Sequence, residues 1–204
     1  MTPRTLIFPV VLGLLALLTT APACTPGEAG EEASHNPVHI DSIFPMEEEL
    51  RRFREGLEAP SGLSGGAPSL ETLVDRYLRR LEAGDGEGIA RMALDRAEFA
   101  YLYFPHTQYV ERPYELSPAF VWYQLGNRSS RGLTRALRLY EGETLHDVGV
   151  ECPEVREPFG VGWVHHGCAV LGALPTGEEV REVLFGSILE LDGRFKFVGF
   201  ANQM

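Results

Sequence analysis

The spacing of apolar residues changes once along the chain, close to Gly142, and this change limits the fold more than any other feature. Before Gly142, apolar side chains recur every three or four residues, which is typical of amphipathic helices. After it, apolar and polar residues alternate, which indicates half-buried strands. Helices followed by consecutive strands predict an α+β fold, with N-terminal helices packed on one curved antiparallel sheet of about four strands.

Two helices are expected at the start of this region. Ser69 can cap a helix whose broad apolar face continues to Leu81. Gly84 can end that helix, and Asp85 can cap a second one that runs to about Leu94. These signals predict a short helical hairpin.

The helical region continues with less regular signals. The aromatic stretch EFAYLYFPH, residues 98–106, fits either a strand or a helix that Pro105 stops. A Ser-Pro pair at 117–118 predicts a helix start, because proline suits the first helical position. A further helix is expected from Ser130 to Gly142.

Four strands are expected in the last third of the chain. Asp192-Gly193 is a strong signal for a two-residue hairpin, and Pro175-Thr176-Gly177 predicts another turn. The predicted strands are residues 144–152, 166–174, 178–191 and 193–201.

The order of these elements resembles the nuclear-transport-factor-2-like superfamily. The resemblance covers residues 68–204 and is carried by LVDRYLRRLEAGDGEGIARM, a later helix and a hairpin ending in DGRFKFVGFAN. It implies a bent sheet wrapped around a long helix to form a cone with an internal pocket. Enzymes of the superfamily, such as ketosteroid isomerases, place a carboxylate opposite oxyanion donors. Those residues do not map one by one onto this chain, so no catalytic residue is carried over.

The first 23 residues have the layout of a secretory signal peptide. Arg4 supplies a positive charge, residues 6–18 are almost entirely apolar, and residues 19–23 are small. The apolar core is shorter than the roughly 20 residues that a transmembrane helix needs. The leader therefore predicts export.

Cys24 follows this leader directly. The stretch Ala21-Pro22-Ala23-Cys24 resembles a bacterial lipobox, in which the cysteine is acylated and becomes the mature N-terminus. Ordinary signal peptidase cleavage after Ala23 is the alternative, and it would leave a soluble secreted or periplasmic protein. We favour lipidation of Cys24, and hence a cell-envelope protein. In such lipoproteins, Thr25 implies the outer membrane facing the periplasm if the cell is Gram-negative.

The sequence after Cys24 divides into four parts. Residues 24–45 predict a flexible tether, since most of them are small or polar. Residues 46–58 predict a short amphipathic helix, which either docks on the main domain or binds a partner. Residues 59–67 predict a second flexible linker, and residues 68–204 the α+β domain.

The charge of the chain excludes one class of partner. The formal net charge is −11, so the basic surface that nucleic acid requires is missing. Attraction to anionic lipid beyond the anchor is disfavoured for the same reason. Lys196 is the only lysine, which we attribute to overall amino-acid usage.

The chain has three cysteines, and lipidation of Cys24 would leave Cys152 and Cys168 as a pair. We expect a disulfide, worth about 3 kcal/mol for a loop of this length. The alternatives are two free thiols or a metal site with His165 and His166. Adjacent strand residues point to opposite faces, so both imidazoles would rarely reach one ion. We therefore expect no metal and no other cofactor.

Aromatic and histidine side chains suggest where a ligand would bind. The expected walls of an apolar pocket are Tyr101, Tyr103, Trp122, His106 and His146. The alternative is that the aromatic rings fill the interior and leave no space for a ligand.

His146-Asp147 is the pair that suggests acid–base chemistry. Neighbours on a strand cannot form a dyad with each other, so His106 or His165 would have to supply the second group. Ordinary strand polarity is the interpretation that we favour for this pair.

Two functions from different classes follow. We expect a non-enzymatic envelope protein whose domain binds a small apolar ligand or a protein partner. The alternative is an isomerase, dehydratase or hydrolase that uses histidine, aspartate or tyrosine groups of the pocket. The chain has no phosphate-binding glycine loop, nucleophile elbow or HExxH motif.

Overall fold

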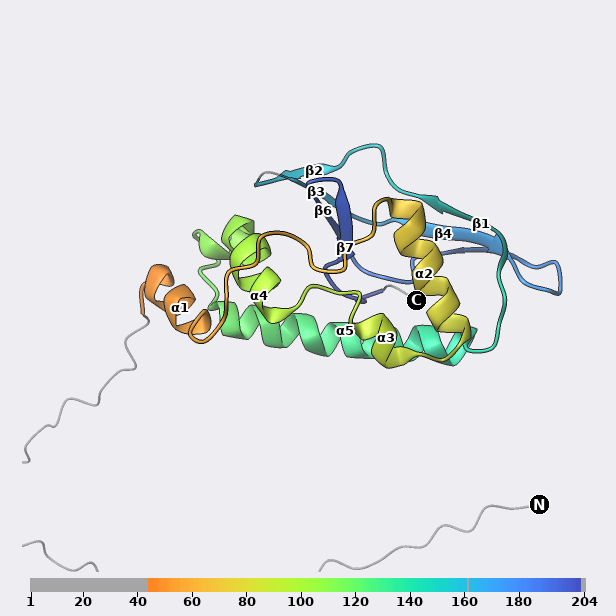
Figure 1. Cartoon of the computed structure of the whole chain (residues 1–204), viewed down its shortest axis with the longest axis horizontal. Coiled ribbons are helices and arrows are strands. Elements are labelled where there is room, and N and C mark those ends of the chain that lie inside the picture. Colours follow the sequence, from red (N-terminus) through yellow and green to blue (C-terminus); the bar gives the residue numbers. More distant parts are fainter. Residues whose placement is uncertain (1–43, 161, 203–204) are drawn as a thin grey trace, which may run out of the picture. The chain divides into compact units, whose positions relative to one another are not determined.

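The computed structural model describes residues 44–160 and 162–202, which belong to one compact unit. The signal peptide, Cys24 and all but the last two residues of the tether lie outside the described residues. Helices precede strands within the unit, so the α+β class is confirmed (Figure 1). The helices are α1 (Met46–Phe53), α2 (Leu70–Glu82), α3 (Gly86–Ala90), α4 (Arg96–Glu98) and α5 (Pro118–Tyr140).

The expected helix caps are present. The Ser69 hydroxyl accepts a hydrogen bond from Thr72 N at 3.1 Å, and the Asp85 carboxylate accepts one from Gly88 N at 2.8 Å. α3 is shorter than expected and ends at Ala90. Side-chain caps satisfy N–H groups that have no partner within the first turn, so they fix where these helices begin.

Residues 98–106 are helical and form no strand. The chain leaves α4 as a π-helical turn over Phe99–Tyr103 and continues as a 3₁₀ turn over Phe104–His106 that includes Pro105. A further 3₁₀ turn covers Gln108–Val110. Phe99 and Phe104 are fully buried, and burial of these large rings favours the irregular helix over an extended strand.

The prediction of two separate helices after residue 117 was wrong. α5 is one helix of 23 residues that passes through Gly126, and its first turn is capped by Ser117 as expected. A glycine inside a helix costs about 1 kcal/mol relative to alanine, and packing of the buried face outweighs this cost. α5 runs along one side of the unit and contacts α1, α2 and α3 (Figure 1).

The strands form two antiparallel sheets, whereas the sequence predicted one sheet of about four strands. One sheet has the order β1-β4-β5 and the other the order β2-β3-β6-β7. The strands are β1 (His146–Glu151), β2 (Glu157–Phe159), β3 (Gly162–His165), β4 (Ala169–Ala173), β5 (Glu179–Glu182), β6 (Ile188–Leu191) and β7 (Arg194–Phe197).

Two local features explain why the structure has two sheets and more strands than predicted. The predicted strand over 178–191 is interrupted at residues 183–187, and its halves, β5 and β6, belong to different sheets. β2 and β3 were missed because their short segments contain proline and glycine, which are rare in strand interiors. The hairpin at Asp192-Gly193 is confirmed, with both residues at positive φ as a type I′ turn requires.

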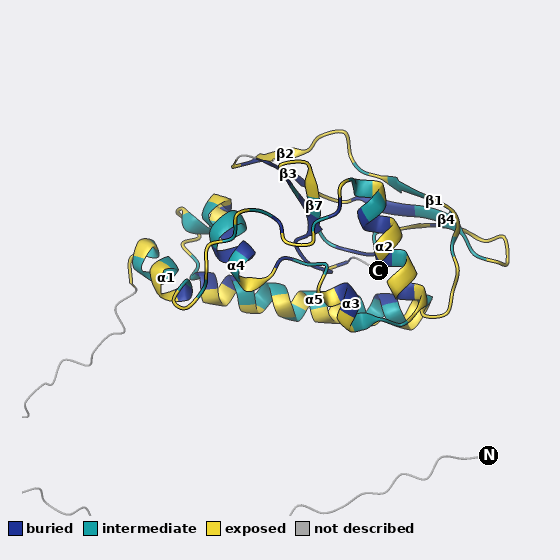
Figure 2. Ribbon diagram, viewed as in Figure 1, coloured by how far each residue is buried: buried dark blue, intermediate teal, exposed yellow. Residues whose placement is uncertain are grey.

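Buried residues lie on α2 and on the strands that it faces (Figure 2), and they belong to one hydrophobic cluster. Tyr77 of α2 is fully buried, and its hydroxyl donates to Leu184 O at 3.2 Å. Its ring lies within 6 Å of three phenylalanine rings, those of Phe185, Phe197 and Phe200. This interior is therefore a packed aromatic core.

The segment before α2 is attached to the domain. The linker expected at residues 59–67 is held by Leu63, which is buried, and by a two-way hydrogen-bonded bridge between Ala67 and Phe195. α1, which ends at Phe53 and not at residue 58, packs Phe53 edge-on against Phe99 at 5.8 Å. The short helix thus docks on the main domain.

Candidate functional site

An apolar groove lies between α5 and the C-terminal segment that follows β7. It has a volume of about 400 Å³, and we call it the α5 groove. Its apolar wall includes Leu94, Trp122, Leu125, Leu133, Val198 and Phe200. A concave, mainly apolar space of this size is typical of sites that hold small molecules.

Two glycine residues of α5 have opposite surroundings, and one of them lines the groove. Gly126 lines it, and a Cβ at this position would meet nothing within 4 Å. Gly132, six residues later, is buried so closely against Phe200 that a Cβ would overlap its carbonyl oxygen. Asn202 stabilises this contact between α5 and the C-terminal segment. Its side-chain amide donates to Gly132 O and to Leu184 O at 3.0 Å each. Gly126 thus leaves space on the groove side of α5, whereas Gly132 lies outside the lining and packs α5 against the C-terminal segment.

Three of the polar residues that line the α5 groove have partners within the domain, and a fourth, Ser130, lies exposed at its edge. Asp95 caps α4, accepting from Glu98 N at 2.8 Å, and Ser129 Oγ accepts from Phe200 N at 3.0 Å. Arg96 donates to Phe53 O at 3.2 Å and stacks on the Phe53 ring at 4.5 Å. These contacts position the polar groups as a rim and leave the lining apolar.

The five residues predicted to form a pocket do not gather at one place. Trp122 lines the α5 groove and packs against Phe99 at 5.0 Å. Tyr103 stacks on Phe159 at 4.9 Å, and His106 meets the same ring edge-on at 5.7 Å. The other two lie apart: Tyr101 faces α1, and His146 is exposed on β1 in the other sheet. Trp122 is thus the one predicted residue that contributes to the groove.

The Tyr103 hydroxyl has a raised pKa. Burial raises the pKa of Tyr103 to about 12, and the nearby Tyr109 and Glu157 act in the same direction. The hydroxyl is therefore protonated at neutral pH, and the ring serves as a packing group beside Phe159.

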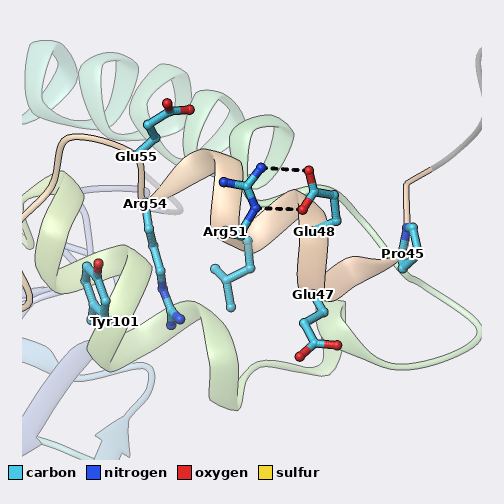
Figure 3. Close-up of a pocket in the computed structure, with 8 residues that line it drawn as sticks. Pro45, Glu47, Glu48, Arg51, Arg54, Glu55 and Tyr101 are labelled. Carbon is cyan, nitrogen blue, oxygen red and sulfur yellow. Dashed lines mark hydrogen bonds and ion pairs between the residues drawn. The ribbon is translucent and has the colours of Figure 1, made fainter.

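A second, more open hollow lies beside α1 (Figure 3). Arg54 crosses it, stacked on the Tyr101 ring at 4.3 Å and donating to Ala100 O at 2.8 Å. Hydrogen bonds from Arg51 and Arg52 lower the pKa of Glu48 to about 2. Except for Tyr101, the residues that line the hollow belong to residues 45–55, so we regard it as part of the contact between the α1 segment and Tyr101.

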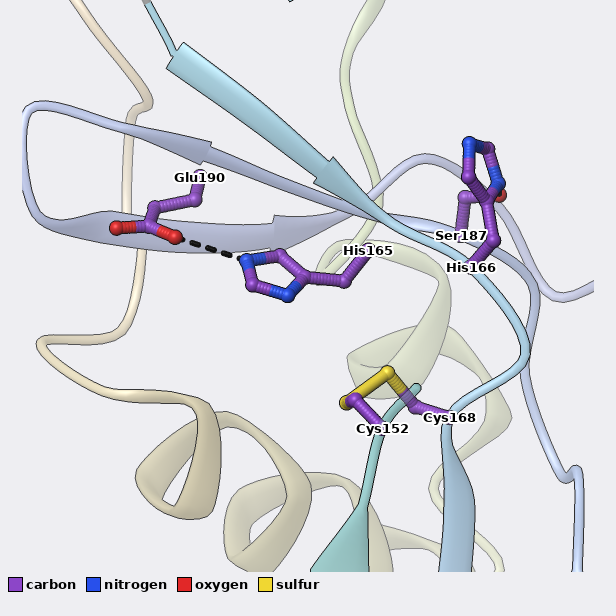
Figure 4. The surroundings of a disulfide bond; sticks show 6 residues. All are labelled: Cys152, His165, His166, Cys168, Ser187 and Glu190. Carbon is purple, nitrogen blue, oxygen red and sulfur yellow. Dashed lines mark hydrogen bonds and ion pairs between the residues drawn. A yellow bond between two sulfur atoms is a disulfide. The ribbon is translucent and has the colours of Figure 1, made fainter. Parts of the chain in front are cut away.

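The sulfur atoms of Cys152 and Cys168 lie at disulfide bonding distance, as predicted (Figure 4). The pair joins the residue after β1 to the residue before β4, and these strands are antiparallel neighbours. Among the described residues, no cluster of three or more histidine, cysteine or carboxylate side chains could hold a metal ion.

The two adjacent histidines point away from each other, as strand geometry predicts (Figure 4). His165 Nε2 lies 2.8 Å from Glu190 Oε2. His166 lies between two other groups, with Nδ1 at 2.8 Å from Ser187 Oγ and Nε2 at 3.0 Å from Glu157 Oε2. The suggested partnership of His146-Asp147 with His165 is absent from these contacts, because His165 bonds to Glu190.

The sequence analysis named Trp122 and His166. It missed the rest of the groove and the contacts of His166 with Ser187 and Glu157, which we call the serine–histidine–glutamate row. The apolar spacing of Leu125 and Leu133 on α5 could have indicated the groove wall, had the helix been recognised as continuous. Ser187 and Glu157 lie 30 residues apart and carry no local motif, so only the sheet pairing brings them together.

Comparison with known proteins gave no relative: no protein-family model, curated protein or solved structure matches this chain. Over residues 44–160 and 162–202, none of the helices combines the length and the apolar character needed to cross a membrane.

Proposed function

We propose that this chain is an exported, lipid-anchored protein of the cell envelope whose α+β domain binds a small apolar ligand in the α5 groove. The leader and Cys24 support the anchor, and a soluble secreted or periplasmic form is the alternative location. The nuclear-transport-factor-2-like resemblance is part of this proposal, since that superfamily combines a long helix, a bent sheet and a ligand pocket.

The apolar lining of the groove is the observation that carries the ligand proposal. Leu94, Leu125 and Leu133 offer no acid, base or nucleophile. The rim groups Asp95 and Ser129 are held by backbone N–H groups, and the lining holds no histidine that could activate Ser130. Such a site favours desolvation of an apolar molecule over catalysis. A protein partner that inserts an apolar side chain is the other occupant that the sequence analysis left open.

Native mass spectrometry of the full-length protein from its own membrane tests the ligand proposal. We expect a bound small molecule on the wild-type protein, and its loss in Gly126→Leu, where the new side chain would occupy the groove. Thr134→Leu adds the same side chain at an exposed position of α5 outside the groove and should retain the ligand. A ligand that survives Gly126→Leu, or no ligand on any form, would refute the proposal.

The anchor has a separate test. Labelled fatty acid should be incorporated into the wild-type protein and not into Cys24→Ser. Labelling that persists in Cys24→Ser would rule out lipidation at this residue.

A hydrolase is the second candidate, and the row Ser187–His166–Glu157 is the observation that favours it. In this reaction Ser187 Oγ would attack an ester carbonyl while His166 takes its proton and returns it to the leaving alcohol. Water would then hydrolyse the acyl-enzyme. It ranks second because the side chains of His166 and Glu157 are 52% and 63% exposed, whereas such sites usually exclude water.

Hydrolysis of 4-nitrophenyl acetate tests this second candidate. A serine hydrolase should lose its activity in Ser187→Ala and keep it in Ser61→Ala, an exposed serine in the segment before α2. Equal rates for the wild type and Ser187→Ala would eliminate the hydrolase.

A further inference from the structure

Positive side chains gather at one small hollow of this acidic protein. The chain carries 29 acidic residues against 18 lysines and arginines. Nevertheless, a hollow of about 170 Å³ between α2 and the segment from Gly88 to Met92 is lined by four cationic residues. They are Arg76, Arg80, Arg91 and Lys196. We call this hollow the basic hollow.

Two of these cations share one face of α2. Arg76 and Arg80 are four residues apart, a spacing that places like charges next to each other and destabilises a helix by a few tenths of a kcal/mol. Arg80 is paired with Asp85, and Arg76 makes no salt bridge to any described residue. The charge of Arg76 is thus available to an anion.

The other two cations come from different segments. Arg91 reaches Glu87 only at 3.7 Å, and both side chains are largely exposed, so this pair is weak. Lys196, from β7, is buried and donates one hydrogen bond, to Glu98 Oε2 at 2.6 Å. An ammonium has three N–H groups, so two remain without an acceptor among the described residues.

The remaining lining defines the size of a ligand. Leu73 and Met92 are apolar, and Gly65 and Gly88 have no side chain. The volume is below the range of about 300–1,000 Å³ that holds drug-sized molecules. The hollow therefore has room for one compact charged group.

We propose that the basic hollow binds a phosphate group. Guanidinium groups match phosphate oxygens with paired N–H donors, and a lysine supplies a compact positive charge beside them. The phosphate can belong to a soluble molecule or to a phospholipid head group, and both present the same oxygens. This site is separate from the α5 groove, because the two share no lining residue. Where they use the same segment of the chain, Arg91 and Met92 line the hollow, and Ala90 and Ala93 line the groove.

Calorimetric titration with inorganic phosphate at low ionic strength tests this inference. The wild-type protein should bind phosphate saturably, and the double variant Arg76→Ala/Arg91→Ala should bind it at least about tenfold more weakly, as loss of about 1.4 kcal/mol implies. The control Arg79→Ala/Arg138→Ala removes the same charge from exposed positions outside the hollow and should bind within about twofold of the wild type.

Vesicles distinguish the two sources of phosphate. The processed chain carrying Cys24→Ser lacks the proposed anchor and can be cosedimented with phosphatidylglycerol vesicles. Vesicle binding that is lost when Arg76→Ala/Arg91→Ala is added, and kept when the control pair is added, would identify a lipid head group. Saturable binding of inorganic phosphate without vesicle binding would identify a soluble phosphate. The inference is overturned if neither probe binds the wild type, or if the control variant weakens binding as much as the double variant does.

Discussion

Lys196 Nζ and Glu98 Oε2 form an ion pair of 2.6 Å between β7 and α4, and both side chains are buried. Glu98 also accepts from Ser64 N at 2.6 Å and from Asp95 N at 2.9 Å. One carboxylate therefore connects the segment before α2, the start of α4 and the last strand. The only lysine of the chain is an element of the core, which amino-acid usage alone does not explain.

Lys196→Met should destabilise the domain strongly. The substitution leaves the Glu98 carboxylate buried without its counter-ion, which typically costs about 3–5 kcal/mol. Urea denaturation followed by circular dichroism measures the free energy of unfolding. Arg91→Ala, which removes an exposed and weakly paired arginine, is the control and should cost less than about 1 kcal/mol. A loss below 1 kcal/mol in Lys196→Met would contradict the structural role of the pair.

Substitution by alanine at two glycines of α5 should change the free energy of unfolding in opposite directions. Gly132→Ala forces a methyl group against Phe200 O and should lose about 1–3 kcal/mol of unfolding free energy. Gly126→Ala enters open space on the same helix and should gain about 0.5–1 kcal/mol. Thermal unfolding of the two variants checks this contrast. A change of the same sign in both would mean that α5 packs differently.

Loss of the disulfide should weaken the sheet formed by β1, β4 and β5. Cys152→Ser/Cys168→Ser releases a loop with a sequence separation of 16 residues, and the chain-entropy model gives about 3 kcal/mol for such a loop. Chemical denaturation of the double variant and of the oxidised wild type measures the difference. Equal stability of the two proteins would count against a disulfide in the native protein.

Alkaline titration should identify Tyr103. Its pKa is raised from 10 to about 12, so the neutral ring contributes stability that is complete below pH 10 and is lost as the pH rises through 12. Ultraviolet absorbance at 295 nm follows tyrosine ionisation. Tyr103→Phe should remove the part of the absorbance change that occurs near pH 12. Loss of absorbance change near pH 10 instead of near pH 12 would show that Tyr103 is more exposed than its contacts imply.

Local signals predicted the elements well where one residue determines a boundary. Ser69, Asp85 and Ser117 cap helices as expected, and Asp192-Gly193 forms its hairpin, because caps and tight turns depend on a few neighbouring atoms. The continuity of α5 through Gly126 depends on tertiary packing, which helix propensity does not contain.

The sheet and the site were harder to predict for the same reason. β2 and β3 are three and four residues long, and only the pairing of β2 with β3 and of β3 with β6 makes them strands. The α5 groove combines Leu94, Trp122 and Phe200 from segments far apart in the chain, so no local pattern marks it. Trp122 was found because large aromatic residues often line ligand sites.

Fluorescence of Trp122 tests the central claim, ligand binding in the α5 groove, most directly. Trp163→Phe leaves Trp122 as the only tryptophan of the chain, inside the groove. Titration with 12-bromododecanoate, whose bromine quenches tryptophan on contact, should give saturable quenching that Gly126→Leu abolishes and Thr134→Leu preserves. Quenching that does not saturate, or that persists in Gly126→Leu, would contradict the assignment of the groove as a binding site.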